Sequence, residues 1–319
     1  MALSGRRFQN DKTRLRMKPI VSVIIPSYNC AKYLPEALDS VVAQTYQDYE
    51  VIIINNGSSD NTEQIVQSYI QRFGPRFRYI YQENSGVSCA RNAGIQTAQG
   101  KYLAMLDADD KWYPHRLAEG IKVIESAEDI GLVHARSMRI TETGEQIGSV
   151  QRDTRYLTGW IFEHVFLRRA NISCPTVLLK KECCDKVDLF DEHLSMLGSE
   201  DRELWMRIAQ KYRIVFIDDI LSYYRVRKGS MSRNNQRMLK AQLYVVDKYC
   251  PENGLNQRLR HQALAQIYRN AGDDFLLDKD FRQASEFYKK SLSFNPLSFW
   301  TRVNYMKSVW KGYCSCGQI

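Results

Sequence analysis

The sequence predicts an α/β fold, with a parallel sheet flanked by helices on both faces, followed by an all-α C-terminal region. Two observations lead to this prediction. Between Val21 and Asp107, short apolar runs alternate with amphipathic helical patterns, which is typical of βαβ units. From residue 236 onward helical patterns replace this alternation.

Seven elements are expected in the first block, and strands and helices alternate among them. They span residues 21–26, 31–45, 49–55, 60–73, 77–83, 88–98 and 101–107. Right-handed crossovers place the carboxyl ends of all four strands at one edge of the sheet. A polar cluster follows each strand there, at residues 26–29, 55–60, 83–86 and 107–110. Because ligands of open α/β sheets bind at this edge, we expect a binding site there.

The most informative segment is KYLAMLDADD, residues 101–110, in which a buried strand ends at three carboxylates, Asp107, Asp109 and Asp110. Carboxylates at such an edge are suitable ligands for Mg²⁺ or Mn²⁺, together with substrate phosphates. An aspartate-rich turn without a metal is the other interpretation of this motif alone.

The segment after the second strand, NNGSSD, combines a tight turn at Gly57 with residues that can cap the next helix. The N–H groups at that helix start favour anions, so we expect nucleotide contact here. Capping alone would also explain Ser59 and Asp60.

A second block, residues 131–226, is less regular. Strands are expected at 131–140 and 175–181, with a short helix at 158–166. A polar loop then leads into a strongly amphipathic helix within residues 190–210, with Ser199 as its cap and Glu200 and Asp201 in its first turn. The helix dipole favours acidic residues there, but a carboxylate that also faces a cleft is a candidate general base.

The C-terminal region contains a pattern similar to part of a tetratricopeptide-type helical hairpin. The matching positions are Ala271, Gly272, Phe281, Ala284, Tyr288, Leu292 and Pro296. One such repeat cannot bury its own apolar face, so the hairpin is expected to pack on the rest of the chain or on a partner.

Charge is concentrated at the ends of this 319-residue chain, whose formal net charge is +9. Residues 1–20 contain six Lys or Arg and one Asp, and residues 297–319 contain three Lys or Arg and no acid. Basic ends are either solvated tails or are attracted to an anionic surface. Because the body is nearly neutral, nucleic acid is not an expected partner. The tail from Phe299 to Trp310 is either a peripheral membrane anchor or a cover for the hairpin.

No apolar window reaches the length of a transmembrane helix, and the N-terminal segment lacks the apolar region of a secretory signal. The eight cysteines have no metal-ligand spacing, so reduced thiols in a cytoplasm are expected. The expected location is the cytoplasm, with peripheral contact at the inner face of the membrane as an option.

Six motifs occur in order: Pro26-x-Tyr28-Asn29, NNGSSDNT, NSGVSCARNAGI, Asp107-x-Asp109, FDEHL and Ser199-Glu200-Asp201-x-x-x-Trp205. As an ordered set they resemble the family-2 glycosyltransferases, which are inverting, metal-dependent enzymes, over roughly residues 18–235. The resemblance implies the GT-A fold, a Rossmann-like mixed and mainly parallel sheet flanked by helices. It places the catalytic domain at 18–235, which leaves the basic arm at 1–17 and the helical region at 236–319.

The same resemblance implies roles for individual residues. Asp109 would bind Mn²⁺ or Mg²⁺, and Asp107 would hold the donor's ribose or sugar, directly or through the metal. Asp201 would be the catalytic base, paired with Glu200. The residues implied in donor binding are Pro26, Tyr28, Asn29, Asn56, Ser58, Asn84, Gly86, Arg91, Asp107, Ala108, Asp109 and Arg227.

The chain departs from the family pattern at two places. Asn55-Asn56-Gly57-Ser58 stands where relatives usually have Asp-Asp-Gly-Ser, which leaves the nucleobase open. Arg227 stands where many relatives have a histidine near the metal, and an arginine cannot ligate a cation but can pair with a phosphate. The segment 229–232 resembles the family's loop over the donor. No Gln-x-x-Arg-Trp motif is present, which favours a single-addition enzyme.

The predicted function is transfer of a sugar from a nucleotide-diphosphate sugar, with UDP as the expected nucleotide, to an acceptor hydroxyl. The acceptor would be a glycan or lipid-linked glycan in polysaccharide, lipopolysaccharide or other cell-surface glycan synthesis. The alternatives are a nucleotidyltransferase or a catalytically silent nucleotide-sugar-binding interaction protein. The sequence does not predict an oligomeric state.

Overall fold

The computed structural model describes residues 18–149, 157–193, 198–227, 235–252, 254 and 256–316. Two predictions lie outside these residues, namely the basic arm at 1–17 and the donor loop at 229–232.

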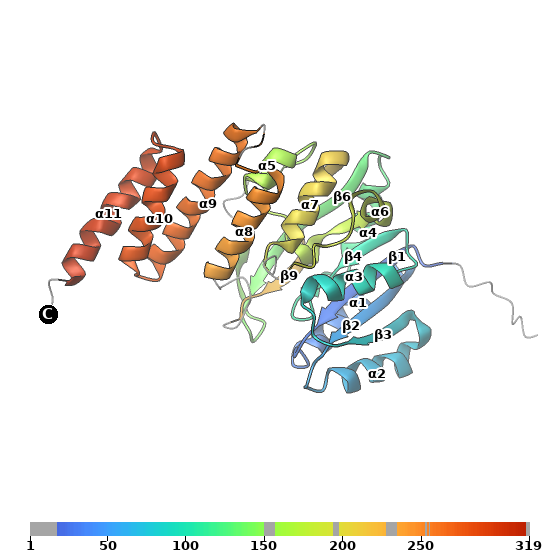
Figure 1. Ribbon diagram of the computed structural model, residues 1–319. Helices are drawn as coiled ribbons and strands as arrows, with labels where there is room; N and C mark the ends of the chain where they lie inside the picture. Colours follow the sequence, from blue (N-terminus) through green and yellow to red (C-terminus); the bar gives the residue numbers. More distant parts are fainter. Residues whose placement is uncertain are drawn as a thin grey trace, which may run out of the picture.

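Within the described residues the strands form one nine-stranded sheet in the order β3-β2-β1-β4-β8-β6-β9-β5, with β7 beside β6 (Figure 1). The strands are β1 Val21–Ser27, β2 Tyr49–Asn56, β3 Phe77–Gln82, β4 Tyr102–Met105, β5 Lys111–Trp112, β6 Ile130–Ile140, β7 Gln146–Ser149, β8 Leu178–Lys180 and β9 Arg213–Arg225. The first four strands pair in parallel, and β8 runs antiparallel to both β4 and β6. This confirms the predicted mixed, mainly parallel sheet.

Helices cover both faces of the sheet because β1 and β2 are apolar on both sides. Ile24 and Ile52 point to the face of α3 and α7, whereas Val23 and Val51 point to the face of α1, α2 and α4. The helices of this part are α1 Leu34–Val42, α2 Thr62–Phe73, α3 Val87–Thr97, α4 Arg116–Ile124, α5 Phe162–Phe166, α6 Lys181–Val187 and α7 Glu200–Lys211. Short 3₁₀ turns occupy Gly74–Arg76 and Cys174–Thr176. The predicted α/β layering is thereby confirmed.

The prediction that Ser199 caps the helix α7 through its side chain was wrong. Ser199 does precede α7, but its hydroxyl makes no capping hydrogen bond. Instead, the Glu200 carboxylate accepts a hydrogen bond from the backbone N–H of Gly198 at 2.6 Å. The N–H of Arg202, one of the donors that a serine cap would serve, is bound by Asp201 Oδ1 at 2.6 Å.

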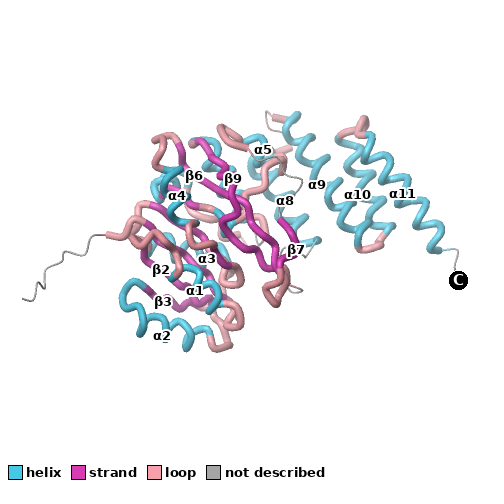
Figure 2. The backbone as a smooth tube through the Cα atoms, turned by 180° about the vertical axis from the view of Figure 1, so that it is seen from behind, coloured by secondary structure: helices cyan, strands magenta, loops and turns pink. Residues whose placement is uncertain are grey.

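The all-α C-terminal region is confirmed. Helices α8 Asn235–Tyr249, α9 Gln257–Leu277, α10 Phe281–Phe294 and α11 Phe299–Cys316 lie side by side and extend away from the sheet (Figures 1 and 2). Val246 and Leu264 belong to the same apolar core as Trp205 of α7. Helices α8 and α9 thus pack on the α/β part, whereas the hairpin positions Ala284 and Tyr288 form a separate small core with Phe275. The tetratricopeptide assignment itself stays a prediction.

Helix α11 packs on α10 with one face and exposes the other. Thr301 and Ser308 are buried, whereas a stripe of large apolar side chains is exposed. We call this the α11 stripe; its residues are Phe299, Trp300, Val303, Met306 and Trp310. No described helix is both long and apolar enough to cross a bilayer.

Candidate active site

A cavity of about 980 Å³ lies at the carboxyl ends of β1, β2 and β4, where the sequence predicted a binding edge. Its volume is typical of sites for small ligands and cofactors. Every predicted site residue except Ser58 lines it, namely Pro26, Tyr28, Asn29, Asn56, Asn84, Gly86, Arg91, Asp107, Ala108, Asp109, Glu200, Asp201 and Arg227. Ser58 lies behind Asn29, where its hydroxyl accepts a hydrogen bond from the Asn29 N–H at 3.0 Å.

The first wall of the cavity is built from the turns after β1 and β2. The amide of Asn56 donates to Asn84 Oδ1 at 3.2 Å and accepts from Gln82 at 2.9 Å. Gly57 has φ +77°, and a Cβ there would lie 2.8 Å from the backbone nitrogen of Asn84. Only glycine fits this close approach. The neutral Asn56 thus ties the end of β2 to the loop before α3.

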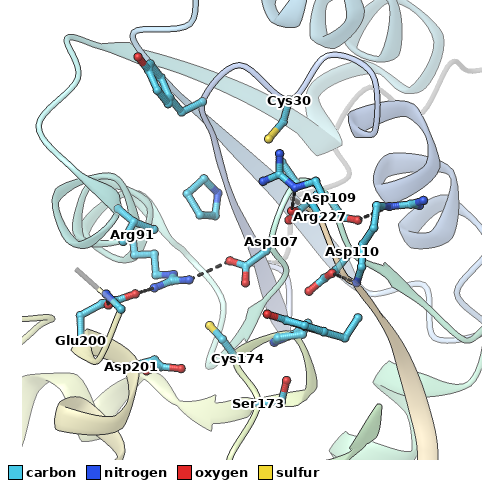
Figure 3. Close-up of a pocket in the computed structure, with 18 of the residues that line it drawn as sticks. Cys30, Arg91, Asp107, Asp109, Asp110, Ser173, Cys174, Glu200, Asp201 and Arg227 are labelled. Atoms are coloured by element: carbon cyan, nitrogen blue, oxygen red, sulfur yellow. Dashed lines mark hydrogen bonds and ion pairs between the residues drawn. The ribbon is translucent and has the colours of Figure 1, made fainter. Parts of the chain in front are cut away.

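The aspartate segment after β4 lies at the centre of the cavity (Figure 3). Asp107 forms an ion pair with Arg91 at 2.8 Å, and Asp109 forms one with Arg227 at 2.6 Å. Each pair uses a single oxygen of its carboxylate. Asp110 points inward, where one oxygen accepts the N–H of Arg225 at 2.8 Å and the other is buried without a partner among the described residues.

This segment carries more negative charge than its partners offset. Burial raises the pKa of Asp109, and Asp107 adds to the effect although Arg227 opposes it. Burial and the charges of Asp109 and Asp107 raise the pKa of Asp110 well above its ordinary value. The raised pKa values of these two carboxyl groups show that their negative charges are poorly compensated, so a cation bound beside them would be stabilised.

The oxygen ligands available at this segment are those that a hard cation prefers. Mg²⁺ and Mn²⁺ are commonly held by one or two carboxylates plus substrate phosphates, and Asp107 and Asp109 supply two carboxylates on one turn. Among the described residues no group of three or more His, Cys, Asp or Glu is placed to hold a metal ion. Asp107 and Asp109 would fit a divalent cation that took its remaining ligands from a diphosphate.

The acidic pair of α7 faces the same cavity, and its two members differ in their contacts. Arg91 bridges the pair to β4, because it binds Glu200 at 2.7 Å as well as Asp107 (Figure 3). Asp201 accepts the N–H of Arg202 at 2.6 Å. Burial, helped by Glu200, raises the pKa of Asp201 to about 6. Glu200 is therefore held in an ion pair, whereas Asp201 is poised to take up a proton near neutral pH.

Arg225 is a site residue that sequence reasoning passed over. Its side chain is buried and donates to the backbone oxygen of Asp109 at 2.8 Å and to Glu36 at 2.9 Å. Together with the N–H bond to Asp110 it fixes the aspartate turn from β9, a strand that was not predicted. The available signal was its position two residues before Arg227, in the sequence Tyr224-Arg225-Val226-Arg227.

Further cavity residues were also missed. Arg168, Asn171, Ser173 and Cys174 belong to short or irregular segments without a motif. Arg139, Arg202 and Arg237 lie on β6, α7 and α8, where nothing in the sequence pattern distinguished them from surface residues.

Comparisons with known proteins agree with this geometry. The family described as "Glycosyl transferase family 2" matches residues 22–176. The uncharacterized glycosyltransferase MJ1057 of Methanocaldococcus jannaschii is 32% identical, over 70% of this chain and 77% of that protein. Uncharacterized glycosyltransferases of Rickettsia prowazekii and Rickettsia typhi are 34% and 33% identical, and the matches span 64% of the length of each.

Two solved structures share the fold. Residues 1–349 of S. aureus TarS, in complex with UDP-GlcNAc, superpose with a TM-score of 0.63 at 19% identity, covering 92% of this chain and 89% of that one. The mannosyltransferase PcManGT from Pyrobaculum calidifontis, in complex with GDP-Man and Mn²⁺, gives 0.60 at 18% identity, covering 93% and 86%. The fold, the cavity and the relatives together show that this chain belongs to glycosyl transferase family 2.

Proposed function

We propose that the chain is a metal-dependent inverting glycosyltransferase that moves a sugar from a nucleotide-diphosphate sugar to an acceptor hydroxyl. The observation that carries this proposal is the meeting of Asp107, Asp109 and Asp201 in one cavity, with Arg91 joining the two sides. A donor diphosphate fits the aspartate side, and an acceptor hydroxyl fits the side of α7.

On the donor side we assign Asp109 and Asp107 to a Mn²⁺ or Mg²⁺ ion. The ion would neutralise the diphosphate leaving group as a Lewis acid. Arg227, which now pairs with Asp109, is placed to bind a donor phosphate instead. TarS with UDP-GlcNAc and PcManGT with GDP-Man and Mn²⁺ have the same fold. They support a nucleotide-sugar donor, for which we propose UDP as the nucleotide.

On the acceptor side we assign Asp201 as general base. It takes the proton of the acceptor hydroxyl while that oxygen attacks the anomeric carbon. The bond between this carbon and the diphosphate oxygen breaks on the opposite face, so the anomeric configuration inverts. A base with a pKa near the working pH is the most effective kind. A nucleotidyltransferase, the alternative from the sequence, would have no use for Asp201.

The rate of transfer is expected to depend on pH through Asp201. Because the pKa of Asp201 is raised to about 6, the carboxylate is deprotonated above that pH and protonated below it. The rate constant should fall about tenfold per pH unit below the pKa and level off above pH ~7. Initial rates between pH 4.5 and 8 at saturating donor test this. A rate that stays constant from pH 4.5 to 8 would contradict the assignment.

We also propose the division suggested by the sequence, with a catalytic domain at 18–235 and a helical region at 236–319 that contacts a membrane surface. The acceptor would then be a lipid-linked or other cell-surface glycan. The α11 stripe lies on a helix that carries Arg302, Lys307 and Lys311 and no acidic residue. An aromatic and basic face of this kind suits the interface of an anionic inner leaflet.

Full-length protein is expected to float with phosphatidylglycerol vesicles at low salt. It should float much less with phosphatidylcholine, or at ~0.5 M salt, where screening weakens attraction to the leaflet. The double variant Trp300→Ser, Trp310→Ser should lose most of the bound fraction. The control variant Arg282→Gln, whose side chain is exposed on α10, should not. Absence of flotation at low salt would rule out the membrane contact.

A further inference from the structure

Four of the cavity residues missed by sequence reasoning are arginines, namely Arg139, Arg168, Arg202 and Arg237. Arg168 and Arg202 meet at the end of α5, where the backbone N–H of Arg168 and the guanidinium of Arg202 both donate to the carbonyl of Val165, at 3.1 and 3.3 Å. Since Arg202 follows Asp201 in α7, this pair lies on the side of the cavity that we assign to the acceptor.

Arg168 has the features of a residue that lacks its ligand. Its backbone φ is +57°, a conformation that residues other than glycine adopt only at a cost in conformational free energy. Its Nε and Nη1 atoms are buried and have no hydrogen-bond partner among the described residues. Burial and the nearby Arg202 lower the pKa of Arg168 to about 9. Buried donors normally have partners, so an acceptor of hydrogen bonds is missing at this place.

The protein's own carboxylates do not fill this place. No ion pair joins Arg168 to a carboxylate in the part of the chain that the structure describes, and Asp201 and Asp274 act on it only at longer range. Asp201 is assigned as base, and on the aspartate side the donor diphosphate has Arg227 and the assigned metal ion, while Arg91 is bound to Asp107 and Glu200. The missing partner is therefore an anion on a second molecule.

We propose that the acceptor carries an oxyanion, a phosphate or a carboxylate, which Arg168 and Arg202 bind beside the hydroxyl that Asp201 activates. The planar guanidinium presents its N–H groups in a fork that matches such an anion. This inference rests on the proposed function, because it takes the donor side of the cavity as occupied by a nucleoside diphosphate. The inference also predicts that neutral glycans are poorer acceptors than glycans that carry such an anion.

The test uses full-length protein saturated with UDP and Mn²⁺, so that the donor phosphate site is filled. Glycerol 3-phosphate, glucuronate and uncharged glycerol are then titrated by calorimetry. We expect one or both anions to bind and glycerol not to bind, and the comparison of the two anions identifies the group.

Arg168→Gln should weaken anion binding at least tenfold without changing the affinity for UDP, and Arg168→Lys should weaken it less. Arg282→Gln, whose side chain is exposed on α10, is the control.

Equal anion binding by wild type and Arg168→Gln, or no anion binding by a wild type that binds UDP, would overturn the inference and leave the proposed function intact. Failure of the wild type to bind UDP would overturn both. Thermal unfolding separates a lost site from a lost fold, since removing one of two like charges should not lower the melting temperature. If Arg168→Gln does not fold, Arg202→Gln takes its place in the same titration, with the same expected loss.

Discussion

Replacing Asp109 by asparagine is expected to abolish sugar transfer while leaving the fold intact. The side chain lies beyond the end of β4 and is outside the apolar core, so its loss should change the free energy of unfolding by no more than ~1 kcal/mol. Asparagine has nearly the same shape but no charge, so it can neither pair with Arg227 nor hold a hard cation well. Calorimetry of UDP binding with and without Mn²⁺ measures the effect.

Wild type should bind UDP much more tightly with Mn²⁺ than without it, and Asp109→Asn should lose this difference. Asp129→Asn is the matched control, because Asp129 pairs with Arg213 on the surface, away from the cavity residues. The metal assignment would be refuted if Asp109→Asn had normal turnover, or if wild type bound UDP equally tightly with and without Mn²⁺.

Replacing Asp201 by asparagine is expected to lower turnover by ~10²–10⁴ and to change donor affinity little. The asparagine oxygen can still accept the N–H of Arg202, the bond that Asp201 makes at 2.6 Å, but it cannot take up a proton. Rates and UDP affinity measured on one preparation separate catalysis from binding.

Glu200→Gln is the informative comparison for Asp201→Asn. Glu200 is held by Arg91 and by the N–H of Gly198, so its loss should disturb alignment and stability more than proton transfer. Its effect on turnover should be the milder one, and the pH dependence should stay. If Glu200→Gln is the more damaging change, the roles within the pair are reversed.

The first half of the fold follows from local patterns. Strands β1, β2 and β4 are apolar on both faces, β3 at the sheet edge is only partly buried, and helices separate all four, so periodicity locates them. Because the carboxyl ends of these parallel strands lie at one edge of the sheet, the sequence also predicts that Asn29, Asn56, Asn84 and Asp107 lie close together. All of these residues line the cavity.

The rest depends on contacts between distant residues. Arg91 and Glu200 are 109 positions apart, and no local pattern links them. Strand β9 was missed because Asp218 and Asp219 interrupt its apolar pattern, and β9 shifts register against β6 in this region. Arg168 lies in an irregular segment, and no sequence pattern there indicates that the fold buries its Nε and Nη1 atoms.

The most direct test of the proposed function is the set of products formed from nucleotide sugars. The chain is incubated with UDP- and GDP-sugars and Mn²⁺, with and without pyrophosphate, and the products are identified by mass spectrometry. Our account predicts release of a nucleoside diphosphate from at least one donor, with none released by Asp109→Asn. Formation of a nucleoside triphosphate and a sugar 1-phosphate on addition of pyrophosphate, or no reaction with any donor, would contradict it.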